Sequence, residues 1–353
     1  MTDKQPEPAP DPFTVTNRRS GHQFQVDADE TVLDGALRHG RVFPYSCRSG
    51  TCGTCKATLV AGRVDYGQYA PQALSDAEKQ RGQVLLCQAI PLEDIVVDVE
   101  EIAAAEAINI KILPCRVTRR ERPAPDVMVL TLRLPQGQEL TYLPGQYIDI
   151  LLRDGRRRSF SLASVPDREA DLQIHVRHVP DGRFTSHVFD GLKERDLLRF
   201  QGPFGTFFLR ADSDRPLVML AGGTGFAPIK AILEHAFDEG LQRPVHLFWG
   251  ARAAPDLYMN TLVETWVRQY RNFRYTPVLS EPSASDAWSG ETGWVHDRVI
   301  HHYPDLGAYD VYASGPPPMI DAARAAFPDH GLQAGRLFYD SFEFAADSIN
   351  VAS

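Results

Sequence analysis

The chain has little of what marks membrane, secreted or nucleic-acid-binding proteins. Its 353 residues hold no uninterrupted apolar run that approaches the length of a membrane span. The N-terminus is polar and rich in proline, unlike a secretory signal. A formal net charge of −9 argues against a nucleic-acid partner. The length suffices for two or three domains, and the composition is that of a soluble protein.

Cysteine is also scarce, with five residues, but four of them follow one pattern. Cys47, Cys52 and Cys55 read C-x4-C-x2-C, and Cys87 comes after a long gap. This is the spacing with which plant-type ferredoxins hold a [2Fe–2S] cluster through four thiolates. Glycine and small hydroxyl residues fill the loop, so its backbone can curl and point N–H groups at sulfides. Zinc and a disulfide stay open as alternatives, although no second C-x-x-C and no paired histidines follow.

The fifth cysteine, Cys115, is expected to be a buried, inert thiol at the start of a strand. Free thiols at an iron–sulfur site, with no targeting segment, indicate a cytoplasmic protein. Residues 1–12 are polar and rich in proline, which predicts a disordered tail.

Residues 13–100 predict a small α+β domain that resembles a β-grasp ferredoxin. A helix should follow the first hairpin, with Asp29 as its N-cap and Gly40 as its stop. Residues 101–109 read as a short helical or extended linker. The expected elements are the hairpin Phe13–Thr16 and Gln23–Val26, the helix Thr31–His39, and the strands Ala57–Val60, Val84–Leu86 and Ile95–Val99.

Residues 110–213 predict an antiparallel barrel, because strand-like runs alternate with turns at Val127–Leu134, Tyr147–Leu152 and Leu172–Val179. The segment Arg158–Ser161 offers an arginine for a diphosphate, an aromatic ring for a ribityl chain and a hydroxyl for a flavin nitrogen. Gly182–Ser186 then opens a helix whose first N–H groups can bind phosphate.

Two histidines of the same region invite a metal site. His175 and His178 have an odd spacing, which places them on opposite faces of a strand and argues against a shared ion. The helix that Gly182–Ser186 opens is expected at Ser186–Leu192.

Residues 214–353 predict an α/β domain with a parallel sheet, because strands alternate with helices. An apolar run leads into the glycine turn Gly222–Gly225, and Pro228 suits the first position of a helix. The expected strands are Pro216–Ala221, Val245–Trp249, Tyr275–Leu279 and Asp310–Ala313, and the expected helices are Ile229–Phe237, Leu257–Tyr270, Val295–His301 and Met319–Phe327.

In this order the three regions resemble the one-chain type of the ferredoxin–NADP reductase superfamily, which includes oxygenase reductase components and CDP-6-deoxy-Δ3,4-glucoseen reductase. The resemblance implies FAD rather than FMN. Two positions depart from the family pattern: Phe160 replaces a tyrosine, and Ser314 replaces a cysteine beside the nicotinamide. The implied flavin contacts are Arg158, Phe160, Ser161, Leu162, Arg177, Gly182, Thr185 and Ser186, and the implied nucleotide contacts are Gly222, Gly223, Thr224, Gly225, Gly250, Arg252, Glu281, Gly315 and Pro316.

Three of these positions carry open alternatives. Arg177 can hold the diphosphate or lie on the surface. Phe342 can cover the flavin face that nicotinamide must reach or belong to an ordinary last strand. Glu281 would repel a 2′-phosphate and accept ribose hydroxyls, which favours NADH, while Arg252 leaves NADPH open.

The resemblance therefore predicts an enzyme that passes electrons from NADH, through FAD and the cluster, singly to an acceptor protein. Ser161, Ser314 and Phe342 are the residues expected beside the reacting rings. The acceptor would be an oxygenase or, alternatively, a PMP-dependent dehydratase, and a slowly turning redox sensor stays open. A monomer is expected.

Overall fold

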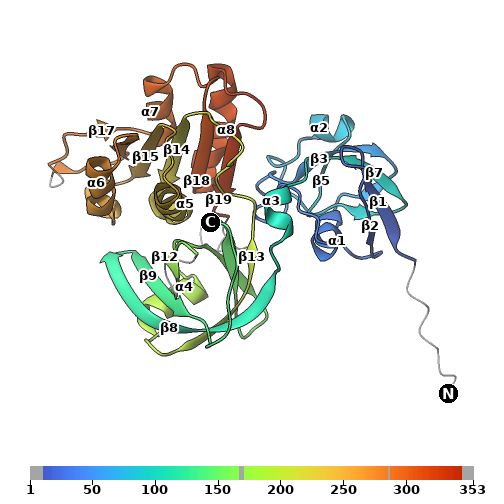
Figure 1. Cartoon of the computed structure of the whole chain (residues 1–353), viewed down its shortest axis with the longest axis horizontal. Helices are drawn as coiled ribbons and strands as arrows, with labels where there is room; N and C mark the ends of the chain where they lie inside the picture. The colour runs from blue at the N-terminus through green and yellow to red at the C-terminus, as the bar shows by residue number, and fades with distance from the viewer. Residues whose placement is uncertain (1–10, 167–170, 285–286, 344–353) are drawn as a thin grey trace. The chain divides into compact units, whose positions relative to one another are not determined.

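The computed structural model describes residues 11–166, 171–284 and 287–343. It divides into two compact units, of which one ends at Asn109 and the other begins at Ile110. Each unit is described by itself (Figure 1). The tail expected at residues 1–12 lies, except for Asp11 and Pro12, outside the described residues.

The first unit is built on a five-stranded mixed sheet with the order β2-β1-β7-β3-β5. The first strand pairs antiparallel with the second and parallel with β7, which confirms the α+β expectation. The linker region contains one short helical turn. The bounds are β1 Phe13–Asn17, β2 Gln23–Val26, α1 Val32–Arg38, β3 Lys56–Ala61, β4 Val64–Asp65, α2 Asp76–Gln80, β5 Gln83–Leu85, β6 Ile90–Pro91, β7 Ile95–Asp98 and α3 Ala103–Glu106.

The N-cap of α1 differs from the prediction. Thr31 caps the helix, because its Oγ1 accepts a hydrogen bond from the backbone N–H of Asp34 at 3.1 Å. Asp29 lies two residues too early to reach an N–H of the first turn. The stop at Gly40 is confirmed, since the chain turns there at a φ of +70°.

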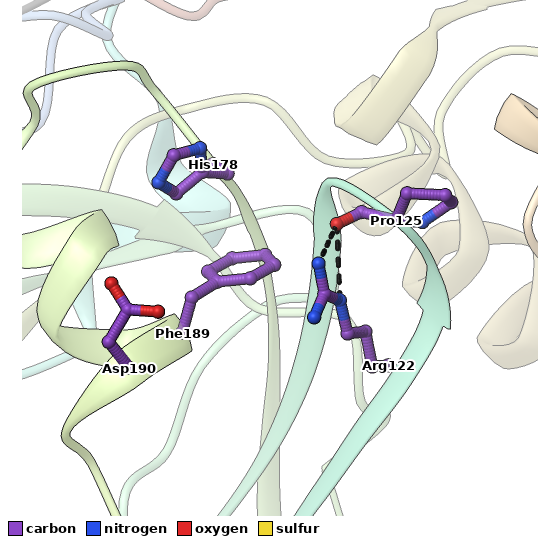
Figure 2. A pocket seen from close by; sticks show the side chains of 5 residues that line it. All are labelled: Arg122, Pro125, His178, Phe189 and Asp190. Carbon is purple, nitrogen blue, oxygen red and sulfur yellow. Dashed lines mark hydrogen bonds between the residues drawn. The ribbon is translucent and has the colours of Figure 1, made fainter.

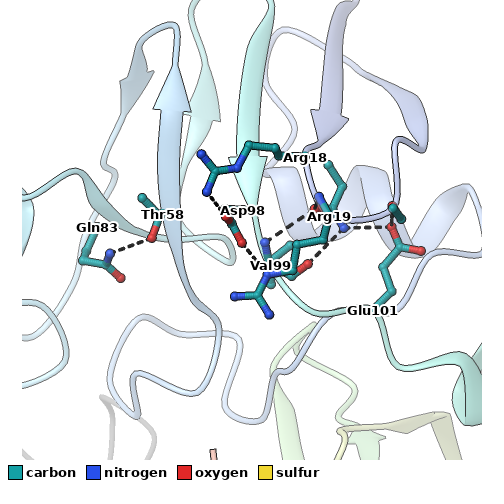
Figure 3. A network of polar contacts seen from close by, with 9 residues as sticks. Arg18, Arg19, Thr58, Gln83, Asp98, Val99 and Glu101 are labelled. Atoms are coloured by element: carbon teal, nitrogen blue, oxygen red, sulfur yellow. Dashed lines mark hydrogen bonds and ion pairs between the residues drawn. The ribbon is translucent and has the colours of Figure 1, made fainter. Parts of the chain in front are cut away.

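A polar network ties β1 to the end of β7 (Figure 3). Asn17 is fully buried, and its Nδ2 donates to the carbonyl of Val99 at 3.0 Å and to Glu101 at 2.9 Å. Arg18 and Arg19 both bind the carboxylate of Asp98. The contacts join residues about 80 positions apart, so they hold the chain end of this unit to its first strand.

The second unit begins with a six-stranded antiparallel barrel, with the order β11-β10-β13-β8-β9-β12. A bridge between Leu162 and Ile174 joins the two outer strands of this order, which closes the barrel. The sequence predicts a strand starting at Cys115 without giving its bounds; in the structure this is the long strand β8, which includes Pro114 and Pro123. The bounds are β8 Lys111–Ala124, β9 Val127–Arg133, β10 Tyr147–Leu151, β11 Arg157–Ser161, β12 Asp171–Arg177, α4 Arg183–Asp190 and β13 Leu197–Phe204.

A parallel sheet with the order β17-β16-β15-β14-β18-β19 follows, as predicted. The helices α5 and α6 cover one face, and α7 and α8 cover the other (Figure 1). The bounds are β14 Leu217–Gly222, α5 Phe226–Asp238, β15 Val245–Ala251, α6 Asn260–Gln269, β16 Phe273–Leu279, β17 Glu291–Thr292, α7 Val295–His302, β18 Asp310–Gly315, α8 Pro317–Ala326 and β19 Leu337–Ser341, with 3₁₀ turns at Gly223–Gly225, Ala254–Asp256 and Phe327–His330.

Three helix starts differ from the prediction. The barrel helix α4 begins at Arg183, so Thr185 lies inside its first turn. The helix α5 begins at Phe226, which makes Pro228 its third residue; no bond is lost there, because the first four N–H groups of a helix have no partner within it. The helix α6 begins only at Asn260, after a separate 3₁₀ turn.

Buried polar contacts join the barrel to the parallel sheet. The Nζ of Lys230 donates to the carbonyl of Ala163 at 2.9 Å and to Glu234 at 2.8 Å. His175 and the hydroxyl of Tyr258 share a hydrogen bond of 2.7 Å. Burial lowers the pKa of His175 to about 3, so the ring is neutral at physiological pH. Such contacts fix the two layers against each other.

Within the described residues, no helix combines the length and the apolar character needed to span a bilayer.

Asp310 tests how the sheet is held at the start of β18. Its fully buried carboxylate binds Arg243 at 2.8 Å and Arg336 at 3.3 Å. Asp310→Ala leaves the buried Arg243 without its counter-charge and should lower the free energy of unfolding by about 3–5 kcal/mol. In the matched surface pair of Arg119 and Glu121, Glu121→Gln should cost under about 1 kcal/mol. Thermal unfolding of the full chain measures both, and equal losses would contradict the assignment.

Candidate functional site

The four cysteines of the first unit lie in two pairs. The thiol of Cys47 is hydrogen-bonded with that of Cys52, and the thiol of Cys55 with that of Cys87. The N–H groups of Ser49 and Cys52 both donate to the sulfur of Cys47 at 3.4 Å. The loop therefore directs backbone donors at sulfur, the arrangement that stabilises thiolates and a bound cluster.

The cluster loop has left-handed backbone at three of its residues. Arg48 has a φ of +58°, Gly50 a φ of +76° and Gly53 a φ of +78°. A Cβ added at Gly50 would lie 2.6 Å from the carbonyl oxygen of Gln68. This position thus has no room for a side chain, and the tight curl brings Cys47 and Cys52 together.

The four cluster thiols differ among themselves, since the pKa is lowered at Cys47 and Cys87 and raised at Cys52 and Cys55. Hydrogen bonds, first from Cys52 and also from hydroxyls of the loop, lower the pKa of Cys47 to about 4. Burial in the barrel raises the pKa of Cys115 to about 12, which keeps it a neutral thiol, as predicted. Across the described residues, no three His, Cys, Asp or Glu side chains gather as they would around one metal ion. The thiols offer two ligands to each of two irons, which fits a [2Fe–2S] cluster.

Four of the predicted flavin residues, Arg158, Phe160, Ser161 and Leu162, lie in or directly after β11. Ser161 is buried, and its hydroxyl donates to Oδ2 of Asp340 at 3.0 Å. The ring of Phe160 lies 5.5 Å from that of Phe184, the second residue of α4. Arg158 is half-buried, and its Nη1 donates to the carbonyl of Arg157 at 2.7 Å. The motif therefore meets the start of α4 and the last strand of the parallel sheet.

The N-terminus of α4 is open to an anion. Gly182 is the N-cap and supplies no side-chain acceptor. Thr185 does not face outward as a hydroxyl donor, because its Oγ1 bonds the backbone N–H and C=O of Val179 at 3.2 and 3.1 Å. The N–H of Ser186 is used within the helix. The remaining N–H groups of the first turn and the helix dipole fit a diphosphate.

A pocket of about 210 Å³ lies between α4 and the turn that joins β8 to β9 (Figure 2). The guanidinium of Arg122 lies 5.2 Å from the ring centre of Phe189, and His178 meets the same ring edge-on at 5.0 Å. Arg122 also donates to the carbonyl of Pro125 at 3.1 Å. The carboxylate of Asp190 completes the wall. A planar, partly polar ring fits this lining.

Arg177 connects the barrel to the glycine turn. A Cβ at Gly223 would lie 2.5 Å from Nη1 of Arg177, so the guanidinium touches the turn itself. Asp126 binds the other side of this guanidinium, at 2.9 Å to Nε and 2.8 Å to Nη2. The side chain is one-third exposed, and its position beside the turn favours anion binding over an idle surface role.

The glycines of the nucleotide half let two strand ends meet. A Cβ at Gly225 would lie 2.0 Å from the carbonyl oxygen of Ser314, and one at Gly315 would lie 3.0 Å from Gly222. Gly250 packs as closely on Val295. The carboxyl ends of β14, β15 and β18 therefore form one closely packed, largely buried cradle of backbone, at the place where parallel sheets bind nucleotides.

The three predicted catalytic residues come together around the last strand. Ser314 pairs with Asp340 across β18 and β19, and Ser161 donates to Asp340. Phe342 follows β19, and its N–H donates to the carbonyl of Gly315 at 2.9 Å. Ser314 is fully buried, and its hydroxyl has no partner among the described residues. That unpaired group fits a polar nicotinamide substituent.

Arg252 and Glu281 lie next to each other just after the ends of the neighbouring strands β15 and β16. The N–H of Glu281 donates to the carbonyl of Arg252 at 2.9 Å. The side chain of Arg252 is 60% exposed and lies 3.5 Å from Asp126 and from Asp256. The ribose end of the nucleotide cradle thus carries more negative than positive charge.

Two site residues escape the sequence prediction. Asp340 lies between predicted aromatics, and nothing local shows that it binds Ser161, 179 positions away. Asp126 lies in an ordinary turn after Pro125 and contacts Arg177 only because the strands β8, β9 and β12 are neighbours.

Comparison with known proteins matches each region to a family. Residues 15–92 match the 2Fe-2S iron-sulfur cluster binding domain, residues 114–209 the oxidoreductase FAD-binding domain, and residues 219–325 the oxidoreductase NAD-binding domain. The chain belongs to the one-chain type of the ferredoxin–NADP reductase superfamily. The sequence-based resemblance is confirmed.

The relatives of this reductase are full-length matches. It is 40% identical to the CDP-6-deoxy-L-threo-D-glycero-4-hexulose-3-dehydrase reductase of Yersinia pseudotuberculosis, over 92% of this chain and 96% of that protein. It is 34% identical to the phenol 2-monooxygenase reductase component DmpP of Pseudomonas, over 97% of each chain. The Amycolatopsis cytochrome P450 reductase GcoB has 32% identity and a TM-score of 0.77, over 94% and 98% of the two chains.

The protein is therefore an NAD(P)H-dependent oxidoreductase with [2Fe–2S], FAD and NADH as cofactors. It transfers electrons from NADH to a partner. When bound, FAD accepts two electrons as hydride and the cluster passes them on one at a time. The chain supplies orientation and charge.

Proposed function

We propose that this reductase serves a separate acceptor enzyme and that electrons leave through the cysteine unit. The pairing of the four thiols, with backbone N–H groups directed at Cys47, carries the proposal. Cys47 is the most exposed of the four, which makes its side of the loop the nearest to a docked partner. A monomeric state and a cytoplasmic location stay predictions from the sequence.

The acceptor is proposed to be either a hexulose dehydrase or an oxygenase. The Yersinia relative names the first kind and the Pseudomonas relative the second. The higher identity to the dehydrase reductase, 40% against 34%, makes a dehydrase the first acceptor to test. Single-turnover reduction of each purified acceptor by this protein and NADH would decide between them.

We propose the following roles for the site residues. The barrel strand β11 and helix α4 hold FAD, with Ser161 held by Asp340 beside the reacting ring. The glycine cradle holds the nucleotide diphosphate, and Glu281 accepts the ribose hydroxyls of NADH. The proposed flavin contacts are Arg158, Phe160, Ser161, Leu162, Arg177, Gly182, Thr185 and Ser186, and the proposed nucleotide contacts are Gly222, Gly223, Thr224, Gly225, Gly250, Arg252, Glu281, Gly315 and Pro316.

Cys87→Ser tests the exit route. The variant should lose the visible spectrum of the cluster and the reduction of cytochrome c, because one iron loses a thiolate. NADH–ferricyanide turnover, which needs only flavin, should survive. Cys115→Ser is the matched control and should keep both activities, since Cys115 lies in the barrel core. Undiminished cytochrome c reduction by Cys87→Ser would refute exit through the cluster.

Glu281→Arg tests the nucleotide preference. Replacing the carboxylate by a guanidinium removes a repulsion and adds an attraction for the 2′-phosphate, so kcat/KM for NADPH relative to NADH should rise roughly tenfold. Steady-state ferricyanide assays with both nucleotides measure the ratio. An unchanged ratio would remove Glu281 from the specificity site.

Phe189→Ala tests whether the pocket beside α4 takes the adenine of FAD. Loss of the ring should weaken FAD binding by roughly two- to tenfold, the size of one aromatic contact. FMN lacks the adenosine and should bind the variant as it binds the wild type. Fluorescence titration of the apoprotein with both flavins measures this, and an equal loss for FMN would mean that Phe189 only supports the fold.

A further inference from the structure

Asp126 holds two arginines that come from different layers of the second unit. It lies in the turn between β8 and β9 of the barrel. Its Oδ2 accepts a hydrogen bond from Nε of Arg177 at 2.9 Å and forms ion pairs with Nη2 of Arg177 at 2.8 Å and Nη2 of Arg252 at 3.5 Å. Its Oδ1 is buried and has no hydrogen-bond partner in the part of the chain that the structure describes. One carboxylate oxygen thus serves a barrel arginine and a sheet arginine together.

The two arginines are placed differently by this contact. Nη1 of Arg177 is not one of the nitrogens that Asp126 binds, and it abuts Gly223 in the glycine turn. Arg252 is drawn toward the barrel, and Asp256 lies 3.5 Å from its Nε. Its main chain is bonded to Glu281, at the ribose end of the cradle. Arg252, which lies next to Glu281 at the end of β15, is therefore paired with two carboxylates, those of Asp126 and Asp256.

A 2′-phosphate needs a cation at this end, and NADH does not. The corner around Arg252 carries three carboxylates, those of Asp126, Asp256 and Glu281, against two guanidiniums, those of Arg177 and Arg252. A dianionic phosphate entering it would have to compete with Asp126 for Arg252. The attraction between charges a few ångströms apart at a partly exposed site is modest, but it is sufficient to shift the preference between NADH and NADPH.

We propose that Asp126 is a specificity-determining residue, which favours NADH by withholding Arg252 from the 2′-phosphate of NADPH. The residue acts through Arg252 and does not touch the nucleotide. This proposal rests on the proposed NADH preference and adds a second carboxylate, from the barrel, to the contribution of Glu281. Nothing in the local sequence around Asp126 points to this role, because the contact exists only across the two layers.

The test uses the full-length holoprotein and two ligands that differ at the 2′ position, adenosine 2′,5′-bisphosphate and ADP. Asp126→Asn keeps the shape of the side chain and removes its charge. It should tighten binding of the bisphosphate roughly three- to tenfold relative to ADP, the effect of releasing one partly exposed charge pair. Isothermal titration measures both affinities, and flavin absorbance checks that FAD is retained.

Two further variants isolate the route of the effect. In an Arg252→Ala background the substitution of Asp126 should have no effect on the bisphosphate, since there is no arginine to release. Glu121→Gln removes one charge from the same hairpin without contacting Arg252 and should leave both affinities unchanged. Asp126→Ser repeats the loss of charge with a smaller side chain, so either folded variant decides the result.

The outcomes separate this proposal from the proposed function. An increase in affinity for the bisphosphate in the Asp126 variants that is absent in the Arg252→Ala background supports the role of Asp126. An equal gain in Glu121→Gln, no gain in either Asp126 variant, or a gain that survives Arg252→Ala overturns it. A wild type that prefers NADPH would instead overturn the proposed NADH preference, whatever Asp126 does.

Discussion

FAD and NADH bring negative phosphate charge, the four cluster thiolates add more, and the chain itself carries a net charge of −9. The structure meets this constraint with backbone N–H groups before it uses side chains. Two N–H groups reach the sulfur of Cys47, the first turn of α4 has no side-chain cap, and the turn before α5 is made of glycine. Fixed dipoles of this kind attract anions without adding mobile charge.

The second requirement is that the flavin barrel and the nucleotide sheet keep their relative position. Hydride transfer needs its reacting atoms within a narrow distance, so a loose joint would be costly. The joint is made of buried polar contacts: Lys230 with Ala163, His175 with Tyr258, and Ser161 with Asp340. Because burial keeps His175 neutral, one side of the joint has no charge that ordinary pH changes could alter.

Sequence patterns predict the parts of this protein that depend on neighbours along the chain. The cysteine spacing, the glycine turn of β14 and the alternation of strands and helices are local signals, and the structure has the expected architecture. The strand β8 was predicted only as a start at Cys115, because Pro114 and Pro123 resemble breaks, although pairing on both sides holds the strand together. The start of α4 was placed three residues late, since nothing in the sequence distinguishes a glycine N-cap from a glycine turn.

The residues that no local pattern reveals are two carboxylates at sites made for anions. Asp126 and Asp340 would repel the phosphates and the electron-rich ring if they faced them. Each instead binds a donor, the guanidinium of Arg177 or the hydroxyl of Ser161, and so fixes the direction in which that donor's remaining groups point. The hydroxyl of Ser161 uses its one proton in the hydrogen bond to Asp340, which leaves the Ser161 oxygen as an acceptor. The protein thus orients these donors before any cofactor binds. A carboxylate can therefore affect binding without touching the bound molecule.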